Sequence, residues 1–505
     1  MNTITEAFLN QKQGQSRSAQ VKSRLDYPVI DTDFHTNTTS PLLEDYIAQY
    51  GGARIVDEFR AGLKKGFGLG AAQWYAATPQ ERVDNRLVRP PFWALPAENS
   101  GDLALATLPS LLYERLQEQG SDYAVLYPNL TLFAPAIGRE DLRRALARAL
   151  NHFHADLYRP YADRLTPVAV LPLHTPQEGI EEAEFAVKEL GLKAAIIPGS
   201  VRRPIKSLAA RYPIEEHPEL ANHLQWQDFF GIDSEYDYDP FWAKVIELGI
   251  NPTTHSSGMG WSARASVSNY MFNHIGHFAD ASEAFAKALF FGGVTQRFPA
   301  LRIGLLEGGA AWGANVYTHL VDRFLKRGGG HVQQYNPEKL DRDLLHSLFE
   351  QYGSDLSRGQ AFNRDEVAQI ALGGGLSPAF QAQTTETDDF ARAGIKSVED
   401  IRDRWVNNFY FGNEADDRTV AYAFNTRATP LNAQVNAFYS SDAGHWDVPE
   451  ISDTLHDTWS LVEEGVITED NFKSLVFSKP YEFYTSNNPD FFKGTAVEAK
   501  LKAVR

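Results

Sequence analysis

The stretch VIDTDFHTN, residues 29–37, organises the rest of the chain. Its first two residues end an apolar run typical of a buried strand, and Asp31, Asp33 and His35 follow at alternate positions. Side chains two residues apart on an extended backbone point to the same side, so Asp33 and His35 can converge just beyond the strand. A carboxylate and an imidazole together suit zinc, manganese or iron. The stretch therefore predicts part of a metal site, and the alternative interpretation is a solvated strand end.

Composition limits the classes of protein to which the chain can belong. Its 505 residues are 43% hydrophobic and 12% aromatic, enough to bury the core of one large enzyme-type domain with additions, or of two to three domains. Acidic residues outnumber basic ones by 65 to 48, which argues against binding to nucleic acid or to an anionic membrane. The chain has no cysteine, so any metal must be held by His, Asp and Glu.

The sequence shows neither the pattern of a secretory signal nor that of a membrane-spanning segment. Residues 1–26 are polar and lack the apolar centre of a secretory signal, so they predict a polar N-terminal arm. No later window offers the roughly 18 uninterrupted apolar residues that a membrane helix needs. We therefore expect a soluble, cytoplasmic chain.

Strand-like and helix-like segments alternate along the chain. After the first strand, strands are expected at 124–127, 165–171, 193–197, 251–255 and 302–307, and helices at 41–50, 108–119, 139–158, 176–190, 240–248 and 282–291. This alternation predicts a parallel sheet with helical crossovers. It favours a closed (β/α)8 TIM-like barrel over an open sheet, and no G-x-G-x-x-G follows a strand as a dinucleotide-binding fold would require.

Three long stretches, near 51–100, 199–239 and 324–402, interrupt the alternation. We interpret them as inserted loops that cover the barrel mouth, where barrel enzymes place their specificity, and the alternative is a surface for a partner chain. The barrel with these insertions is expected to span 27–494. It includes a helical C-terminal region over 451–477, and 495–505 form a tail.

Polar side chains follow three further apolar segments of the chain. His255 directly follows the segment 251–254, Glu307 follows 303–306, and Asp442 follows 437–439 after two serines. In a barrel all carboxyl ends of the strands face one mouth, so these residues can meet Asp33 and His35 there. A single strand-end histidine is more often a structural hydrogen-bonding residue, and a glutamate before two glycines is as easily part of a turn. Their joint occurrence in this order predicts a metal centre.

Several segments resemble a known family. They are VIDTDFH, RLTPVAVLPL, ELGLKAAIIPG, FWAKVIELGINPTTHSSG, GGVTQRFPALRIGLLEGGAAW, YSSDAGHWDVP and SNNPDFFKGT. Together they resemble the amidohydrolase superfamily, specifically the amidohydrolase-2 group of metal-dependent hydrolases and decarboxylases related to aminocarboxymuconate-semialdehyde decarboxylase. The resemblance implies a metal-dependent barrel enzyme and does not name a substrate.

The family pattern implies roles for individual residues. The first strand usually carries H-x-H, and here Asp33 replaces the first histidine while His35 is retained. His255 matches the metal ligand after the fifth strand, and Asp442 matches the ligand and proton-transfer aspartate after the eighth. Glu307 stands where this group often has a catalytic histidine. An acid at the position of Asp33 resembles the decarboxylase and related branches.

The sequence also leaves open whether the site binds a second ion. Glu307 could act as general acid or base, or could hold a second metal. His274 and His277 are three residues apart, so on a helix they share a face and could supply further ligands. Their alternative role is ordinary hydrogen bonding. We therefore expect one or two divalent ions, zinc, manganese or iron.

These features predict a metal-dependent hydrolase that acts on a small organic substrate. The ion would be held by Asp33, His35, His255 and Asp442, and Asp442 or Glu307 would move the proton of the activated water. One alternative is a decarboxylase, or an oxygen-dependent hydroxylase with an iron-containing and possibly dinuclear centre. Another is a non-catalytic partner subunit of a related enzyme. We expect a homo- or hetero-oligomer.

Overall fold

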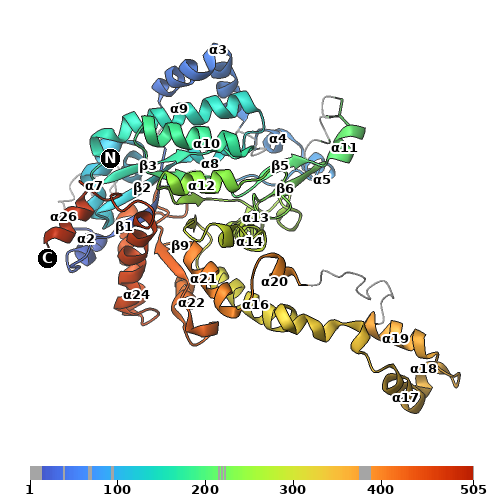
Figure 1. The fold of residues 1–505 in the computed structure, drawn as a ribbon. Helices are drawn as coiled ribbons and strands as arrows, with labels where there is room; N and C mark the ends of the chain where they lie inside the picture. The colour runs from blue at the N-terminus through green and yellow to red at the C-terminus, as the bar shows by residue number, and fades with distance from the viewer. Residues whose placement is uncertain are drawn as a thin grey trace. The chain divides into compact units, whose positions relative to one another are not determined.

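The main sheet has eight parallel strands, in the order β1-β2-β3-β4-β7-β8-β9-β10 (Figure 1). The computed structural model describes residues 14–37, 40–65, 71–91, 96–213, 216–217, 220, 223–374 and 388–503. The strands are β1 (Ile30–Thr36), β2 (Tyr123–Pro128), β3 (Leu165–Val170), β4 (Ala194–Ile196), β7 (Pro252–Thr254), β8 (Ile303–Leu305), β9 (Phe409–Asn413) and β10 (Asn436–Tyr439).

The first and last strands meet and close the sheet. Phe34 in β1 forms a parallel bridge with Ala443, just beyond β10. The His35 amide donates to the Ala443 carbonyl at 2.7 Å, and the Asp442 amide donates to the Asp33 carbonyl at 3.1 Å. The predicted (β/α)8 barrel is therefore confirmed. All eight strands are buried on both faces, which explains why strands such as β2 and β3 are largely apolar runs rather than alternating patterns.

Helices lie between successive strands, as the right-handed crossovers of a parallel barrel require. They are α7 (Pro109–Gln119), α9 (Glu140–Tyr158), α10 (Pro176–Glu184), α12 (Asp239–Glu247), α14 (His277–Phe291), α16 (Ala311–Arg327) and α21 (Val398–Asn408), with the short α8 (Asn129–Phe133), α13 (Tyr270–His274), α15 (Val294–Arg297) and α22 (Ala421–Phe424) beside them. Capping residues in the local sequence determine where these helices begin and end. Thr175 caps α10 through the Glu178 amide, and Gly120 ends α7 with a φ of 96°.

The stretch 51–100 contains helices within its described residues. Helix α3 (Pro41–Lys65) continues through a kink at Gly52, whose φ of 74° interrupts it, so the expected helix end at Tyr50 is the kink rather than a terminus. Three short helices follow: α4 (Ala71–Ala76), α5 (Pro79–Asp84) and α6 (Ser100–Thr107). Residues 66–70 and 92–95 of this stretch lie outside the described part of the chain.

The stretch 199–239 forms an antiparallel hairpin and a short helix. The elements are β5 (Val201–Pro204), α11 (Lys206–Arg211) and β6 (Gln225–Asp228). Buried Arg203 donates to the Asp228 carboxylate at 2.9 Å and to the His174 carbonyl at 2.7 Å, which anchors the hairpin to the end of β3. Residues 214–215, 218–219 and 221–222 lie outside the described part.

The chain divides into two compact units, and the smaller one is Thr318–Ile401. Within its described residues it is helical, with α17 (Arg342–Tyr352), α18 (Ser354–Ser357), α19 (Arg364–Leu372) and α20 (Asp389–Arg392). Within this unit, Phe349 packs edge-to-face against Phe362, and Phe324 packs edge-to-face against Phe390. Residues 375–387 lie outside the described part of the expected insertion at 324–402.

The terminal segments pack against the larger unit. The C-terminal helices are α23 (Thr454–Glu463), α24 (Glu469–Lys473), α25 (Lys479–Thr485) and α26 (Ala496–Ala503). Phe491 and Phe492 are buried against Tyr123 and Tyr484, so this aromatic tail forms part of the barrel base. Of the expected polar N-terminal arm, residues 1–13 lie outside the described part, and α2 (Arg17–Lys22) buries Ala19 and Val21. Residues 504–505 of the expected C-terminal tail also lie outside it.

Small residues are required where the barrel interior is narrow. A Cβ on Gly304 of β8 would lie 2.8 Å from Thr253 Cγ2 and 3.2 Å from Phe438 Cζ, so the site has no room for a side chain. Among the helices that the structure describes, none is long and apolar enough to cross a membrane.

Candidate metal centre

Ends of four barrel strands deliver the predicted ligands to one place. Asp33 and His35 lie within β1, two residues apart, and both side chains are fully buried. His255 comes directly after β7, Glu307 lies two residues after β8, and Asp442 lies three residues after β10. Parallel strand ends share one mouth, so residues far apart in sequence become neighbours.

One group of possible ligands consists of Asp33, His35 and His255. His255 Nε2 lies 3.0 Å and 3.1 Å from the two carboxylate oxygens of Asp33. His35 Nε2 lies 3.1 Å from Asp33 Oδ1. Three donor atoms at these separations can surround a single ion.

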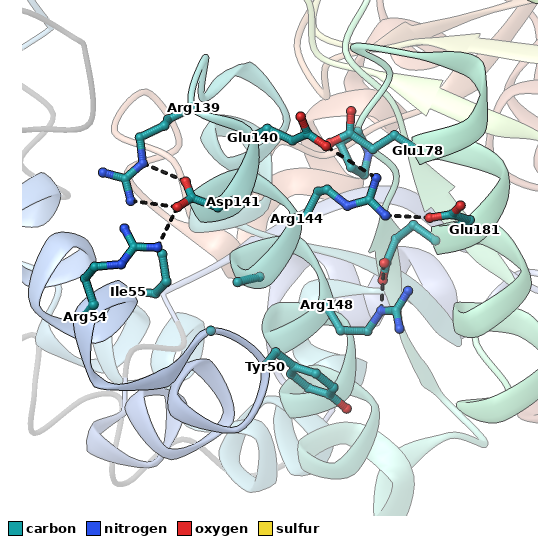
Figure 2. A pocket seen from close by; sticks show the side chains of 14 residues that line it. Tyr50, Arg54, Ile55, Arg139, Glu140, Asp141, Arg144, Arg148, Glu178 and Glu181 are labelled. Carbon is teal, nitrogen blue, oxygen red and sulfur yellow. Dashed lines mark hydrogen bonds and ion pairs between the residues drawn. The ribbon is translucent and has the colours of Figure 1, made fainter.

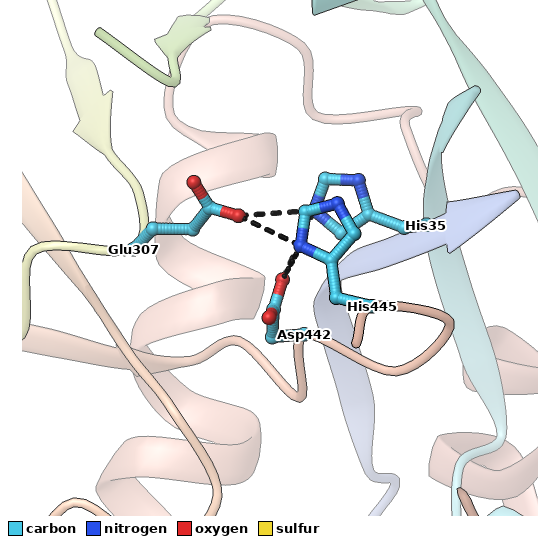
Figure 3. A group of neighbouring side chains, drawn as sticks. All are labelled: His35, Glu307, Asp442 and His445. Carbon is cyan, nitrogen blue, oxygen red and sulfur yellow. Dashed lines mark ion pairs between the residues drawn. The ribbon is translucent and has the colours of Figure 1, made fainter. Parts of the chain in front are cut away.

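A second group consists of His35, Glu307, Asp442 and His445 (Figure 3). His445 Nδ1 lies 3.0 Å from Glu307 Oε1 and 2.8 Å from Asp442 Oδ1. His35 Nε2 lies 3.1 Å from the same Asp442 oxygen and 3.6 Å from Glu307 Oε1. The rings of His35 and His445 are stacked with their centroids 3.5 Å apart. The two groups therefore share His35.

The two carboxylates of the second group sit on unusual backbone. Glu307 has a φ of 57° and Asp442 a φ of 54°, both in the left-handed region that side chains other than glycine rarely occupy. Such conformations persist only where surrounding contacts hold them, and they concentrate at functional sites. Here the two carboxylates lie 3.0 Å and 2.8 Å from His445 Nδ1.

Asn129 orients both stacked histidines. It begins α8 directly after β2, and its Nδ2 donates to Asn37 Oδ1 at 2.6 Å, so its Oδ1 is the acceptor. That single oxygen lies 3.2 Å from His35 Nδ1 and 3.3 Å from His445 Nε2. Both nitrogens must therefore donate, which leaves the lone pairs of His35 Nε2 and His445 Nδ1 directed at the carboxylates.

Replacing Asn129 with leucine should weaken metal binding. The change keeps the volume and removes the acceptor that fixes both imidazoles, and loss of such an orienting partner typically costs about 10- to 100-fold in metal affinity. Calorimetric titration of the metal-depleted chain with Mn²⁺ measures this. The same substitution at the exposed Asn85 is the control, and an unchanged affinity in the Asn129 variant would show that Asn129 does not orient the ligands.

Asp31 joins the two ends of the closed barrel beneath the site. Its Oδ1 accepts from the amides of Ser441 and Asp33 at 3.0 Å and 3.1 Å. Its Oδ2 accepts from the Ser441 hydroxyl at 2.5 Å and from Gln119 Nε2 at 2.7 Å. Burial raises the pKa of Asp31 to about 7, although the hydrogen bonds from Ser441 and Asp33 oppose this rise. Asp31 is therefore a positioning residue for the ligand-bearing segments.

We expect the substitution Asp31→Asn to destabilise the fold by about 1–3 kcal/mol, because an amide group replaces one acceptor oxygen and leaves buried donors unpaired. Urea unfolding of the metal-depleted chain isolates this effect from metal binding. The exposed Asp26→Asn provides the matched control. Equal unfolding free energies for the two variants would contradict the role assigned to Asp31.

The donor set fits a divalent metal ion. Among the residues that the structure describes, His35 Nε2, Glu307 Oε2 and Asp442 Oδ1 are buried and make no hydrogen bond, although His35 Nε2 and Asp442 Oδ1 face each other at 3.1 Å. An ion between such atoms supplies the missing partner. The donors are imidazole nitrogens and carboxylate oxygens, a set that suits zinc, manganese and iron.

The remaining sequence predictions concern His274 and His277, which belong to neither ligand group among the described residues. His277 Nδ1 lies 3.0 Å from the Ser257 hydroxyl, and His274 Nδ1 lies 3.1 Å from the Tyr270 hydroxyl. The His274 ring packs against Trp446, next to His445. Both histidines therefore lie outside the ligand groups, and their role as ligands stays a prediction.

Sequence reasoning did not assign a role to His445, Asn129 or Glu414. His445 stands three residues after Asp442, and that spacing was the available signal. Glu414 follows β9 directly, and burial together with the neighbouring Asp442 raises its pKa well above the usual value. It was missed because β9 itself was not predicted.

A cavity of about 750 Å³ lies elsewhere, on the outer helices α3, α9 and α10 (Figure 2). Its arginines are paired with acids: Arg54 with Asp141 at 2.7 Å and Arg148 with Glu182 at 2.8 Å are examples. These ion pairs satisfy the charges that line the cavity, so we assign it no ligand.

Comparison with known proteins places the chain in a family. The family model described as amidohydrolase matches residues 30–355. A search of curated proteins finds no match. The solved structures that match the chain share little sequence identity with it.

A dihydroxybenzoic acid decarboxylase from Polaromonas sp. JS666, with bound manganese and 2-nitroresorcinol, is 15% identical with a TM-score of 0.49, covering 92% of this chain and 99% of that one. A 5-carboxyvanillate decarboxylase from Novosphingobium aromaticivorans DSM 12444, complexed with manganese, is 14% identical with a TM-score of 0.45, covering 91% and 96%. A 4-oxalomesaconate hydratase from Rhodopseudomonas palustris is 16% identical with a TM-score of 0.45, covering 94% and 100%.

Proposed function

The chain belongs to the amidohydrolase family, and on that premise we propose that it is a metal-dependent hydrolase acting on a small organic substrate at the barrel mouth. Asp33, His35, His255 and Asp442 would hold the ion. A divalent ion at such a site activates a water molecule and polarises a substrate carbonyl. The observation that carries this proposal is the pair of buried ligand groups centred on His35.

Asp442 is the residue that would move the proton. Burial alone would raise its pKa, but the neighbouring His445 and His35 hold that pKa well below the usual range, so the carboxylate is ionised. An ionised carboxylate within the ligand group can accept the proton of the attacking water and return it to the leaving group. Among the described residues, Glu307 Oε2 has no hydrogen-bond partner, so this oxygen could orient that water.

The test uses water labelled with ¹⁸O. The Mn²⁺-loaded protein is screened against esters, lactones and amides in H₂¹⁸O, and products are analysed by mass spectrometry. Hydrolysis places one ¹⁸O in the product per turnover. Absence of ¹⁸O from every product formed, or absence of any bound ion, would contradict the proposal; the latter outcome would favour a non-catalytic subunit.

Decarboxylation is the second candidate, and one feature of Glu307 favours it. Burial and the nearby Asp442 raise the pKa of Glu307, which favours its protonated form. A protonated carboxyl at the site could protonate the carbon from which CO₂ leaves. Release of CO₂ with one deuterium incorporated from D₂O, and no ¹⁸O, would support this reaction. Oxygen uptake in the same assays would instead support the oxygen-dependent alternative.

A further inference from the structure

We propose that helix α17 of the smaller unit pairs, antiparallel and about a two-fold axis, with α17 of a second copy of this chain. The residues that form the contact belong to the insertion near 324–402 and include none of the proposed metal ligands. The pairing therefore does not depend on the proposed function. It gives this insertion the role of a partner surface, and the partner is a second copy.

Helix α17 exposes a stripe of apolar side chains. Leu344, Leu348 and Tyr352 follow one another at intervals of four residues, so they lie along one face of the helix. Their exposed fractions are 57%, 43% and 71%, and Leu356 in the following α18 is 76% exposed. An exposed apolar surface of this kind is typical of a protein–protein contact.

The other side of α17 already holds the smaller unit together. Helices α17, α18 and α19 lie together within this unit (Figure 1). Phe349 packs edge-to-face against Phe362, and His346 Nε2 lies 2.8 Å from the Phe362 carbonyl oxygen. Arg364 Nε, at the start of α19, lies 2.7 Å from Asp343 Oδ1. The apolar stripe is not used in these contacts, so it is available for a second contact.

The small core of these helices explains why the stripe needs a permanent partner. Among their described side chains, α17 and α18 bury none fully, and α19 buries Val367 and Ala368. Small units that bury too little apolar surface commonly gain stability by oligomerisation. A second copy of the same chain is always present in equal amount, so it can cover the stripe in every molecule.

The exposed area is close to what a dimer needs. The side chains of the stripe and of Leu356 together expose on the order of 500 Å² per copy, so a symmetric contact would bury roughly 1,000 Å² in total. Specific interfaces bury about 1,200–2,000 Å² in total, polar rim included. The apolar stripe can therefore form the centre of an interface at the lower end of this range.

The charges at the two ends of the stripe favour the antiparallel arrangement. Asp341 caps the first turn of α17, and the exposed Arg358 follows α18, beyond the other end of α17. A two-fold axis between Leu348 and Tyr352 brings the amino end of one α17 to the carboxyl end of the other. Asp341 of each copy then lies near the oppositely charged Arg358 of the other, and the two helix dipoles oppose each other.

The first experiment measures the mass of the full chain in solution by size-exclusion chromatography with light scattering. We expect a dimer at micromolar concentration. Leu348→Asp should raise its dissociation constant by about 100-fold or more, because the contact would then bring two carboxylates into an apolar centre. Leu42→Asp makes the same change at a leucine of α3 that is 60% exposed, and should leave the dimer intact. Circular dichroism checks that both variants are folded.

The second experiment locates the contact. The chain has no cysteine, so one introduced cysteine reports on one position. Gln351→Cys places a thiol beside the stripe and close to the proposed two-fold axis, and mild oxidation should join two copies by a disulfide. Gln73→Cys, at an exposed position of α4, should give no such product.

A wild-type chain that is monomeric at every concentration tested would overturn the pairing. A dimer that survives Leu348→Asp and gives no disulfide at Gln351→Cys would overturn it as well, since another face would then hold the copies together. Metal content and hydrolysis are measured on the same samples. A dimer without hydrolysis contradicts only the proposed function, and a monomeric hydrolase contradicts only the pairing.

Discussion

The variant His255→Ala should lose the metal ion and lower kcat/KM by about 10³-fold or more. His255 Nε2 is in contact with both oxygens of Asp33, so its removal breaks the first ligand group at its centre. Activation of water and polarisation of a carbonyl by an ion are together worth several kcal/mol, and each 1.4 kcal/mol is about tenfold in rate. Elemental analysis after dialysis measures the ion, and initial rates on the substrate found by screening measure kcat/KM.

A matched variant guards against an indirect effect on the fold. His152→Ala removes a half-buried imidazole on α9 that contacts the Tyr50 hydroxyl. His152 is not one of the proposed ligands, so this variant should retain the full metal content. If the two variants have similar unfolding curves, the loss of metal and activity in His255→Ala comes from removal of the ligand and not from unfolding of the chain. If His255→Ala kept both its ion and its activity, His255 would not be a ligand and the first group would be wrong.

The barrel and the strand-end residues could be predicted because their signals are local. The alternate positions of Asp33 and His35 follow from the period of a strand, and the polar residues His255 and Glu307 directly follow buried apolar runs. In a parallel barrel these ends meet whatever the intervening loops do. The sequence was therefore sufficient to bring these residues together without knowledge of the loops.

Strand β9 was missed for a physical reason. Phe409–Asn413 is a short run that follows α21 directly, and the preceding stretch near 324–402 showed no alternation of strands and helices. Length and flanking glycines, which identify short buried strands, gave no signal there. As a result Glu414, which follows β9, was not considered as part of the site.

His445 and Asn129 needed three-dimensional information. His445 faces Asp442 because Gly444 takes a positive φ that only the folded loop reveals, and the stacking on His35 joins segments some 400 residues apart. Asn129 lies at the start of a helix, a position where asparagine ordinarily caps the backbone. Its contact with two histidines through one oxygen depends on the register of β1 and β2, which the sequence does not specify.

The variant Asp442→Asn should lower kcat by about 10³-fold when measured at saturating Mn²⁺. Asparagine has nearly the same shape and retains one oxygen, but it cannot accept the proton of the attacking water, and general base catalysis contributes about 10²- to 10⁴-fold. The loss should appear in kcat more than in KM, since the base acts in the transition state.

Asp447→Asn makes the same chemical change in the same loop and is the matched control. Asp447 belongs to neither ligand group among the described residues, so its replacement should alter kcat only a few-fold. A comparable loss in both variants would indicate that the charge of the loop, rather than the carboxylate of Asp442, sustains the reaction. Full activity in Asp442→Asn would indicate that Glu307, rather than Asp442, moves the proton. In the described part of this centre, Glu307 Oε2 is the other buried carboxylate oxygen without a hydrogen bond.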